Sequence, residues 1–163
     1  MNTKILPESG LKIVSGGQTG ADRAALDWAI AHQIPHGGWC PKGRKAEDGI
    51  IPSRYNLTET PSFEYSARTQ WNVRDSDGTV IFSISEAIFA GTLLTVKLAK
   101  KTEKPYIHIH RKLTYGNIIN QFQLFLLKFA IVNLNVAGSR ASDEPEVYQF
   151  VREILDRAFL HLK

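Results

Sequence analysis

Apolar stretches of strand length alternate with stretches of helical periodicity along the chain, and this alternation limits the fold more than any other feature. Strand-like runs occur at residues 11–15, 34–39, 79–84, 105–110 and 132–137. Apolar residues with helical spacing occur at residues 21–32, 65–75, 91–101, 117–129 and 144–162. Strands and helices in this order are joined by right-handed crossovers and build a mainly parallel sheet covered on both faces. The sequence therefore predicts a Rossmann-like three-layer α/β/α sandwich, formed by residues 1–163 as a single domain.

Between the second predicted strand and the second predicted helix the regular pattern stops. Residues 40–49 are rich in glycine, proline and charge, and we expect a long loop there. Ser66 is expected to cap the helix that follows.

Composition and charge are compatible with a small anionic ligand and do not indicate nucleic acid or membrane as a partner. The 163 residues are 43% hydrophobic, which is enough for a normal core. The formal net charge is only +4 and the basic residues are scattered, so no nucleic-acid-binding surface is predicted. Residues 122–134 are strongly apolar, but Gln123 and Lys128 interrupt them and the run is too short to span a bilayer.

Cysteine content and the N-terminal residues indicate a cytoplasmic protein. Cys40 is the only cysteine, so no intrachain disulfide and no thiolate metal cluster can form within one chain. Residues 1–9 include Lys4 and Glu8 and have no apolar core of signal-peptide length. We expect these residues to be a frayed lead-in.

A glycine-rich turn follows the first predicted strand and is the first candidate binding loop. Its sequence is Ser15-Gly16-Gly17-Gln18-Thr19-Gly20, in which three of six residues are glycine. Missing side chains let backbone N–H groups approach a ligand, and the turn opens a helix, whose amino end favours anions. We predict that residues Gly16, Gly17, Gln18, Thr19 and Gly20 bind a phosphate or another anionic group. The turn is neither a Walker A motif nor a G-x-G-x-x-G motif, and a tight turn that needs glycine only for its dihedral angles stays the alternative.

Two further loops have the same character. Gly91 and Thr92 begin a predicted helix, where a phosphate can approach the backbone. Gly138, Ser139 and Arg140 follow the last predicted strand, and the arginine can bind a carboxylate or phosphate through two hydrogen bonds. The alternatives are close packing of helix on sheet for Gly91 and a solvent-exposed turn for Arg140.

Charged residues outside these loops are weaker candidates. Lys42 and Arg68 are predicted to join an electropositive rim over the ligand, together with Arg44, Lys45 and Arg74. Asp75 and Asp77 precede a central strand and are candidates for orienting a ribose, a pterin amine or a hydrated magnesium ion. A solvated charged surface and a simple Asp-Gly turn are the respective alternatives.

Neither a metal centre nor a nucleophilic hydrolase is predicted. His108 and His110 alternate along one strand and so face the same side, but no third ligand is evident and histidines at a sheet edge are the favoured interpretation. The sequence has no G-x-S-x-G motif, and no base can be assigned to Cys40.

Taken in order, the motifs resemble a known family. The strings SGGQTGADRAALDWAI, GGWCPKGRKAEDGIIPSRY, ARTQWNVRDSDGTVIF, AGTLLTVKLAKKTEKP and LNVAGSR are similar to those of the molybdenum carrier proteins. These belong to the Rossmann-like superfamily that also contains the LOG-type nucleotide phosphoribohydrolases. The resemblance runs from Leu11 to the final helix and implies a carrier of molybdenum cofactor, a phosphorylated pterin, assembled as a homo-oligomer.

Departures from the relatives bear on catalysis. The phosphoribohydrolases have a Gly-Gly-x-Gly-Thr-x-x-Glu pattern, whereas Thr95 stands where that glutamate is expected. Loss of such a general acid or base lowers a rate by roughly two to four powers of ten, so binding without turnover is predicted and no catalytic residue is assigned. Ser139 stands where many relatives have proline, which weakens its assignment.

Two alternative functions stay open. The first is a phosphoribohydrolase-like enzyme in which Glu47, Asp48 or Asp75 replaces the absent glutamate. The second is a nucleotide-sensing scaffold with the apolar residues 122–129 as an oligomer face.

Overall fold

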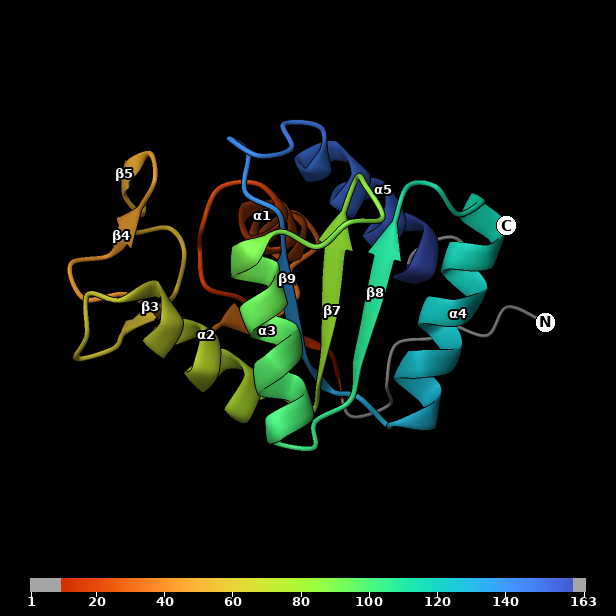
Figure 1. Ribbon diagram of the computed structural model, residues 1–163, viewed down its shortest axis with the longest axis horizontal. Coiled ribbons are helices and arrows are strands. Elements are labelled where there is room, and N and C mark those ends of the chain that lie inside the picture. Colours follow the sequence, from red (N-terminus) through yellow and green to blue (C-terminus); the bar gives the residue numbers. More distant parts are fainter. Residues whose placement is uncertain (1–9, 160–163) are drawn as a thin grey trace.

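The protein is built on a five-stranded parallel sheet, seen in a computed structural model that describes residues 10–159. The strand order is β2-β1-β9-β7-β8 (Figure 1). The strands are β1 (Lys12–Val14), β2 (His36–Gly37), β7 (Gly78–Ser83), β8 (Tyr106–His110) and β9 (Asn133–Gly138). Every pair of neighbours in this sheet is parallel, so the predicted fold class is confirmed.

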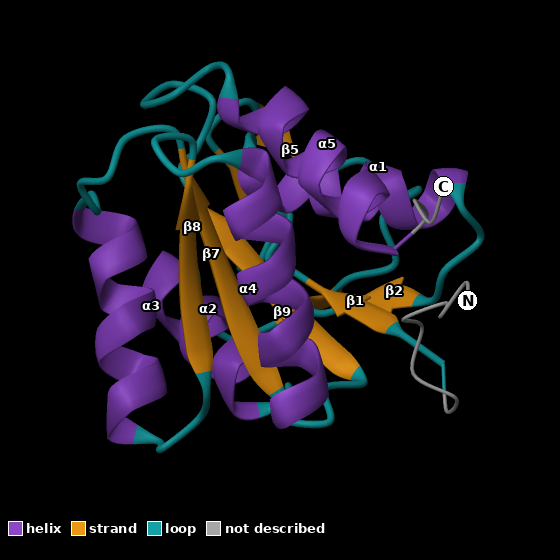
Figure 2. Ribbon diagram, turned by 90° about the vertical axis from the view of Figure 1, so that its right-hand side faces the viewer, coloured by secondary structure: helices purple, strands orange, loops and turns teal. Residues whose placement is uncertain are grey.

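Helices cover both faces of the sheet and complete the three layers (Figure 2). One layer contains α1 (Ala21–Ala31), α4 (Tyr115–Lys128) and α5 (Val147–Phe159), with α5 in contact with both α1 and α4. The opposite layer contains α2 (Tyr65–Arg74) and α3 (Ala90–Lys101), which contact each other. These bounds agree with the sequence-based expectations to within a few residues. The predicted frayed lead-in at residues 1–9 and the end of the last predicted helix lie outside the described residues.

The main core lies between the sheet and the layer of α1, α4 and α5. Phe82 of β7 meets Phe122 of α4 and Phe150 of α5 edge to face, with ring centroids 6.2 and 6.0 Å apart. Phe122 also packs edge to face on Phe159 at 5.9 Å. Large buried rings therefore fill this side of the sheet, each contributing substantial apolar burial. The side of α2 and α3 has no comparable cluster among the buried residues and holds the pocket described below.

Residues 40–49, expected as a long irregular loop, contain short strands. Strand β3 (Trp39–Cys40) pairs in parallel with β6 (Thr58–Glu59), and β4 (Lys45–Ala46) forms an antiparallel hairpin with β5 (Gly49–Ile50). Two-residue strands are too short to show a periodic apolar pattern, which is why the sequence did not indicate them. The prediction that Ser66 caps this helix was wrong. Glu64 is the N-cap residue of α2, and no side chain caps that helix end.

The apolar helix α4 belongs largely to the core. Its buried residues are Ile118, Phe122, Phe125 and Leu126, whereas Leu124 and Leu127 are exposed. Within residues 10–159, no helix has both the length and the apolar composition that a membrane span requires. The homo-oligomer expected from the resemblance stays a prediction.

Candidate functional site

A pocket lies at the carboxyl edge of the sheet, over β9 and between α2 and α3. The empty space between its walls is about 770 Å³ with the open mouth included. The chain leaves β1 toward the α1 layer and leaves β7 toward the α3 layer, while β9 lies between these two strands. This is a topological switch point, the place where open parallel sheets bind ligands.

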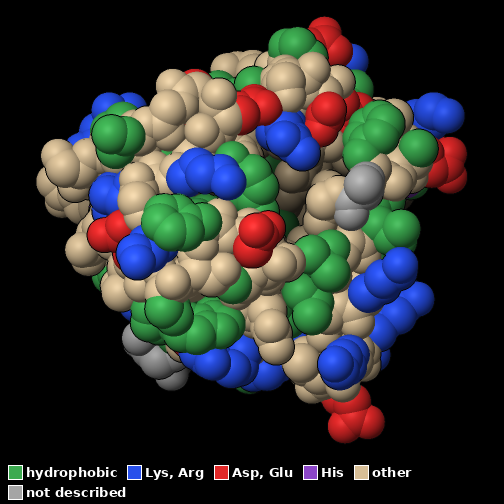
Figure 3. Space-filling model, turned by 60° about the vertical axis from the view of Figure 1, so that its left-hand side comes forward, with side chains coloured by type: hydrophobic (Ala, Val, Ile, Leu, Met, Phe, Trp, Pro, Cys, Tyr) green, Lys and Arg blue, Asp and Glu red, His purple; other side chains and the backbone are tan. Residues whose placement is uncertain are grey.

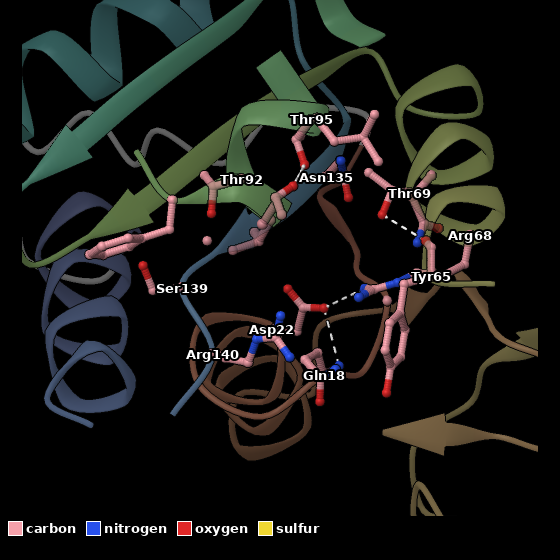
Figure 4. A pocket seen from close by; sticks show the side chains of 18 of the residues that line it. Gln18, Asp22, Tyr65, Arg68, Thr69, Thr92, Thr95, Asn135, Ser139 and Arg140 are labelled. Atoms are coloured by element: carbon pink, nitrogen blue, oxygen red, sulfur yellow. Dashed lines mark hydrogen bonds and ion pairs between the residues drawn. The ribbon is translucent and has the colours of Figure 1, made fainter. Parts of the chain in front are cut away.

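The three loops predicted from the sequence converge on this pocket (Figure 4). The β1–α1 loop, the start of α3, the β9–α5 loop and α2 all supply lining residues. The predicted site residues among them are Gly16, Gln18, Arg68, Gly91, Thr92, Gly138, Ser139 and Arg140. Parallel strands present their carboxyl ends at one edge, and this common direction brings loops distant in sequence together.

The remaining predicted residues of the first loop shape the turn and do not line the pocket. Gly17 and Gly20 have φ angles of 77° and 82°, in the left-handed region that glycine adopts readily. The Thr19 hydroxyl donates to Glu47 and accepts from the Ala141 amide at 3.1 Å. Thr19 therefore holds the β1–α1 loop against the β9–α5 loop.

A buried ion pair between Asp22 and Arg68 forms one wall of the pocket. Arg68 Nη1 lies 2.9 Å from Asp22 Oδ2, and the side chains are 14% and 7% exposed. The same oxygen accepts the Gln18 amide at 3.1 Å. Burial raises the pKa of Asp22, while the charge of Arg68 and the Gln18 amide act in the opposite direction.

Arg68 has a further unusual feature. Its Nε is enclosed and has no hydrogen-bond partner among the described residues. A buried N–H left in this state costs about 1–3 kcal/mol, so an acceptor on a ligand would relieve that cost. Sequence reasoning named Arg68 as one of several rim cations and did not reveal this buried position.

The other predicted rim cations do not line the pocket. Lys42 Nζ lies 5.2 Å from the centre of the Phe63 ring, and Lys45 Nζ lies 4.7 Å from that of Tyr65. Arg44 donates to backbone carbonyls of residues 51–57 and pins that loop. Arg74 stacks on Trp71 and pairs with Asp75. The face that carries β3, β6 and α2 accordingly mixes cationic and apolar side chains (Figure 3).

Asp75 and Asp77 lie away from the pocket, at the amino edge of the sheet, because both residues precede β7. Asp77 Oδ2 accepts the amides of Val132 and Asn133 at 3.1 and 2.7 Å. Burial alone would raise the pKa of Asp77, but these amides outweigh it and the pKa is lowered. Asp75 accepts from Trp39 Nε1 at 2.8 Å and pairs with Arg74. The structure thus does not bring these two residues together with the three loops.

Glu144 connects the β9–α5 loop with the β7–α3 loop. Its Oε1 accepts from Ser139 Oγ at 2.6 Å and from the Ile84 amide at 3.0 Å, and its Oε2 accepts from the Ser85 amide at 2.8 Å. Burial acts to raise the pKa of Glu144, but these donors outweigh it and lower the pKa. The Ser139 hydroxyl is consequently engaged within the protein.

Asn135 is a pocket residue that sequence reasoning missed. It lies on β9, is 3% exposed and donates through Nδ2 to Thr79 Oγ1 at 3.1 Å. A signal was present, since Asn133 and Asn135 alternate with the apolar residues Leu134 and Val136 along a central strand. Such alternation places polar groups on the sheet face below α3.

Thr95, which stands at the position of the hydrolase glutamate, also lines the pocket. The three carboxylates considered as replacements do not. Glu47 accepts from Thr19 and Ser142, and Asp48 forms a two-point ion pair with Arg23 at 2.7 and 2.8 Å. Asp75 lies at the opposite edge of the sheet. The carboxylates that do line the pocket are Asp22 and Asp143.

The two histidines of β8 face the same side, as the alternation predicts. Their ring centroids are 5.2 Å apart, and His108 Nε2 lies 2.6 Å from Ser83 Oγ. Burial and His110 lower the pKa of His108. No group of three or more His, Cys, Asp or Glu residues arranged to hold a metal occurs within residues 10–159.

Comparison with known proteins agrees with the resemblance seen in the sequence. Residues 13–159 match the model of the circularly permutated YpsA SLOG family. A crystal structure of a "Putative molybdenum carrier protein" from Syntrophus aciditrophicus SB is 46% identical, with a TM-score of 0.88. The match covers 92% of this chain and 94% of that one. No protein with curated annotation matches the chain.

Proposed function

The chain belongs to the circularly permutated YpsA SLOG family, and on this basis we propose that it binds a phosphorylated small molecule in the pocket without turning it over. The observation that carries the proposal is the enclosed Arg68 Nε without a partner among the described residues, in a pocket where three strand-end loops meet. An anionic oxygen is the acceptor that a guanidinium binds best, because the hydrogen bond is charge-assisted.

The amino end of α3 supports an anionic ligand independently. Its N-cap residue, Phe89, makes no side-chain cap, and Gly91 in the first turn has open space where a Cβ would lie. Thr92 lines the pocket beside it, 6% exposed (Figure 4). Uncapped amides at a helix start, with the helix dipole behind them, form a favourable site for phosphate.

Molybdenum cofactor, a phosphorylated pterin, is one ligand of the proposed class. The relative from Syntrophus aciditrophicus carries the name of a molybdenum carrier, which supports this choice. The pocket lining consists of amide, hydroxyl, guanidinium, carboxylate and apolar groups and contains no thiol or imidazole among the described residues. Cys40 is buried in a separate cluster with Leu26 and Tyr55. We therefore propose contacts to the phosphate and the organic part of the ligand rather than bonds to the metal.

Binding without turnover rests on Thr95. A threonine side chain lacks the carboxylate that would donate or accept a proton in glycosidic cleavage. Its hydroxyl Oγ1 faces the Gly91 carbonyl at 3.5 Å. The test is a panel of nucleoside monophosphates incubated with purified protein. Release of a free base at a rate above that of a protein-free control would favour the enzymatic alternative.

Ligand binding is tested by native mass spectrometry of freshly purified protein, followed by denaturation and identification of any released molecule. Thermal shifts with AMP, ribose 5-phosphate and inorganic phosphate complete the test. We expect Arg68→Lys to weaken binding, because lysine lacks the planar fork of N–H donors. Arg74→Lys is the matched control, since Arg74 lies on the same helix, is exposed and stacks on Trp71. Wild-type protein that neither carries nor binds a phosphorylated compound would refute the proposal.

A further inference from the structure

The two edges of the main sheet differ in length and in protection. The edge strand β2 has two residues, whereas β8 at the other edge has five. β8 pairs with β7 along its whole length without a bulge, and no strand lies beyond it among the described residues (Figure 2). Its sequence, Tyr-Ile-His-Ile-His, has no lysine or proline, the residues that commonly protect an edge. Such an edge favours pairing with a further strand.

The register of β8 shows which of its backbone groups face outward. The Thr79 amide donates to the Pro105 carbonyl at 3.0 Å, and alternate residues of a parallel strand direct their N–H and C=O groups to the same side. Ile107 and Ile109 therefore continue the ladder to β7. The residues whose backbone groups face away from the sheet are Tyr106, His108 and His110. Apart from the His110 carbonyl, which accepts the Leu113 amide at 3.3 Å, these groups have no hydrogen-bond partner within residues 10–159.

Helix α4 contacts β8 and has an outer face without charge. Residues 113–127 contain no Asp, Glu, Lys or Arg, whereas each of the other four described helices contains at least two such residues. On this face, Leu124 and Leu127 are 57% and 62% exposed. Depletion of charge beside exposed apolar side chains is typical of the centre of a protein–protein interface.

One flank of this face lies on the side of the open edge. In its layer, α5 lies between α1 and α4 (Figure 2). On the flank toward α5, Gly116 lines a shallow groove together with Arg157. Helical spacing places Asn117, Gln121 and Leu124 together on the other flank, away from α5. An uncharged helix flank and an unpaired strand edge are thus continuous with each other.

A second copy of the chain is the partner that covers both features. An extended peptide would pair with β8 but would leave Leu124 exposed, whereas a second copy supplies a strand and a helix in the same relation. A twofold axis perpendicular to the sheet makes the two β8 strands antiparallel and keeps both α4 helices on one face. The uncharged flanks then meet without like-charge repulsion. Lys128, the only charged residue of α4, lies at the helix end, so the two copies of it lie at opposite ends of the contact.

We propose that this face is a dimer interface, in which β8 pairs with β8 of a second copy and the two sheets join into one. An axis through His108 sets Tyr106 opposite His110 of the partner subunit. Three such residue pairs, each exchanging two backbone hydrogen bonds, give about six bonds across the interface. The α4 helices cover each other's leucines. The pocket stays open, because it lies over β9 between α2 and α3 and away from this edge.

The first test places charges near the axis. β8 and α4 run side by side in opposite directions, so an axis through the middle of the strand passes near Gln121, in the middle of the helix (Figure 1). Gln121 is exposed, so the fold should tolerate substitution there. In sedimentation velocity of the full chain, Gln121→Lys and Gln121→Glu should each raise the dimer dissociation constant by at least about tenfold. An equimolar mixture of the two variants should restore dimers. Gln70→Lys, exposed on α2 in the opposite layer, is the control and should dimerise like the wild type.

The second test removes one outward N–H of β8. Proline at position 108 lacks this donor but leaves the ladder to β7 intact, because that ladder uses Ile107 and Ile109. His108→Ala loses the same side chain, including its contact with Ser83 Oγ, and keeps the N–H. We expect His108→Pro to dimerise more weakly than His108→Ala by about tenfold.

Wild-type protein that sediments as a monomer throughout the concentration range would overturn the inference. A dimer that both Gln121 variants leave intact would overturn it too, since another face would then hold the dimer. Weakening by both variants without rescue in their mixture would refute the twofold contact between the α4 helices. Equal dimerisation of His108→Pro and His108→Ala would refute the pairing of the β8 strands.

Discussion

Arg68 lies directly against Gly16, so closely that a Cβ on residue 16 would collide with Nη1 and come within 2.9 Å of Cδ and Cζ. Packing of the guanidinium is therefore the reason for glycine at this position. Backbone conformation is not the reason, because the φ angle of Gly16 is not in the left-handed region. The ion pair with Asp22 therefore depends on the absence of a side chain in the β1–α1 loop. The glycine-rich turn, predicted to admit a ligand's phosphate, also admits a cation of the protein itself.

Gly16→Ala should displace Arg68 and weaken ligand binding. We expect the dissociation constant for AMP to rise by about tenfold or more, because a charge-assisted hydrogen bond to the ligand is lost or misplaced. Gly116→Ala is the control: Gly116 lies in the first turn of α4, and a Cβ added there would meet no atom within 4 Å. That change should raise stability by about 0.5–1 kcal/mol and leave binding unaltered. Wild-type affinity in Gly16→Ala would show that Arg68 does not contact the ligand.

Gly91→Ala tests whether the ligand lies at the amino end of α3. The added methyl group meets no protein atom within 4 Å, so the helix should form normally and its melting temperature should not fall. The methyl group would, however, occupy space beside the first amides of the helix, where the phosphate is proposed to lie. We expect affinity for ribose 5-phosphate to drop by about tenfold, measured by calorimetry. Unchanged affinity together with an unchanged fold would place the phosphate elsewhere in the pocket.

Glu47 joins two pocket loops from the β4–β5 hairpin, and its removal should loosen both. Its carboxylate accepts from Thr19 and from Ser142, at 3.2 Å for the amide and 2.6 Å for the hydroxyl. Glu47→Ala should lower the melting temperature by about 2–4 °C, the change expected for about 1 kcal/mol in a chain of this size. Affinity for AMP should fall several-fold, because the loops are no longer held in the binding geometry. Asp48→Asn removes the ion pair between the same hairpin and Arg23 of α1. This variant should be less stable than the wild type but should bind AMP with unchanged affinity.

Much of the fold and the meeting of the three loops could be predicted from the sequence. Apolar periodicity is a local property, and parallel connections bring the ends of β1, β7 and β9 to one edge without any knowledge of side-chain contacts. The same rule of direction should have excluded Asp75 and Asp77, since residues that precede a strand lie at the opposite edge. Their selection rested on residue type and ignored strand polarity.

The pairing of Asp22 with Arg68 could not be predicted, because it joins residues 46 positions apart on helices of opposite layers. Sequence patterns indicate which helix face is buried but not which buried residue of another helix it meets. Lys42, Arg44 and Arg68 were all candidates because of their charge, and only the tertiary structure shows that Arg68 pairs with a buried carboxylate while Lys42 lies over an aromatic ring and Arg44 donates to carbonyls. The hairpin β4–β5 escaped prediction for the different reason that its strands are two residues long.

Glu144 should make the stability of the protein sensitive to acid. Its pKa is lowered in the folded state relative to the usual 4.5, because the donors from Ser139, Ser85 and Ile84 outweigh burial. A lowered pKa contributes stability that is fully present above the unfolded value and is lost as the pH falls through the folded value. Wild-type protein should therefore lose this contribution below about pH 4.5.

Glu144→Gln removes the titration and retains one acceptor oxygen. We expect a loss of about 1–3 kcal/mol at pH 7, because one buried donor loses its partner and the others lose a charged one. Below pH 4.5 the difference between the variant and the wild type should narrow, as the wild-type carboxylate becomes protonated. Urea denaturation at pH 7, 5, 4 and 3 measures both effects, with the exposed Glu146→Gln as the control. A constant difference across this range would mean that Glu144 keeps the same proton occupancy in both states, and the acid sensitivity would then belong to other carboxylates such as Asp77.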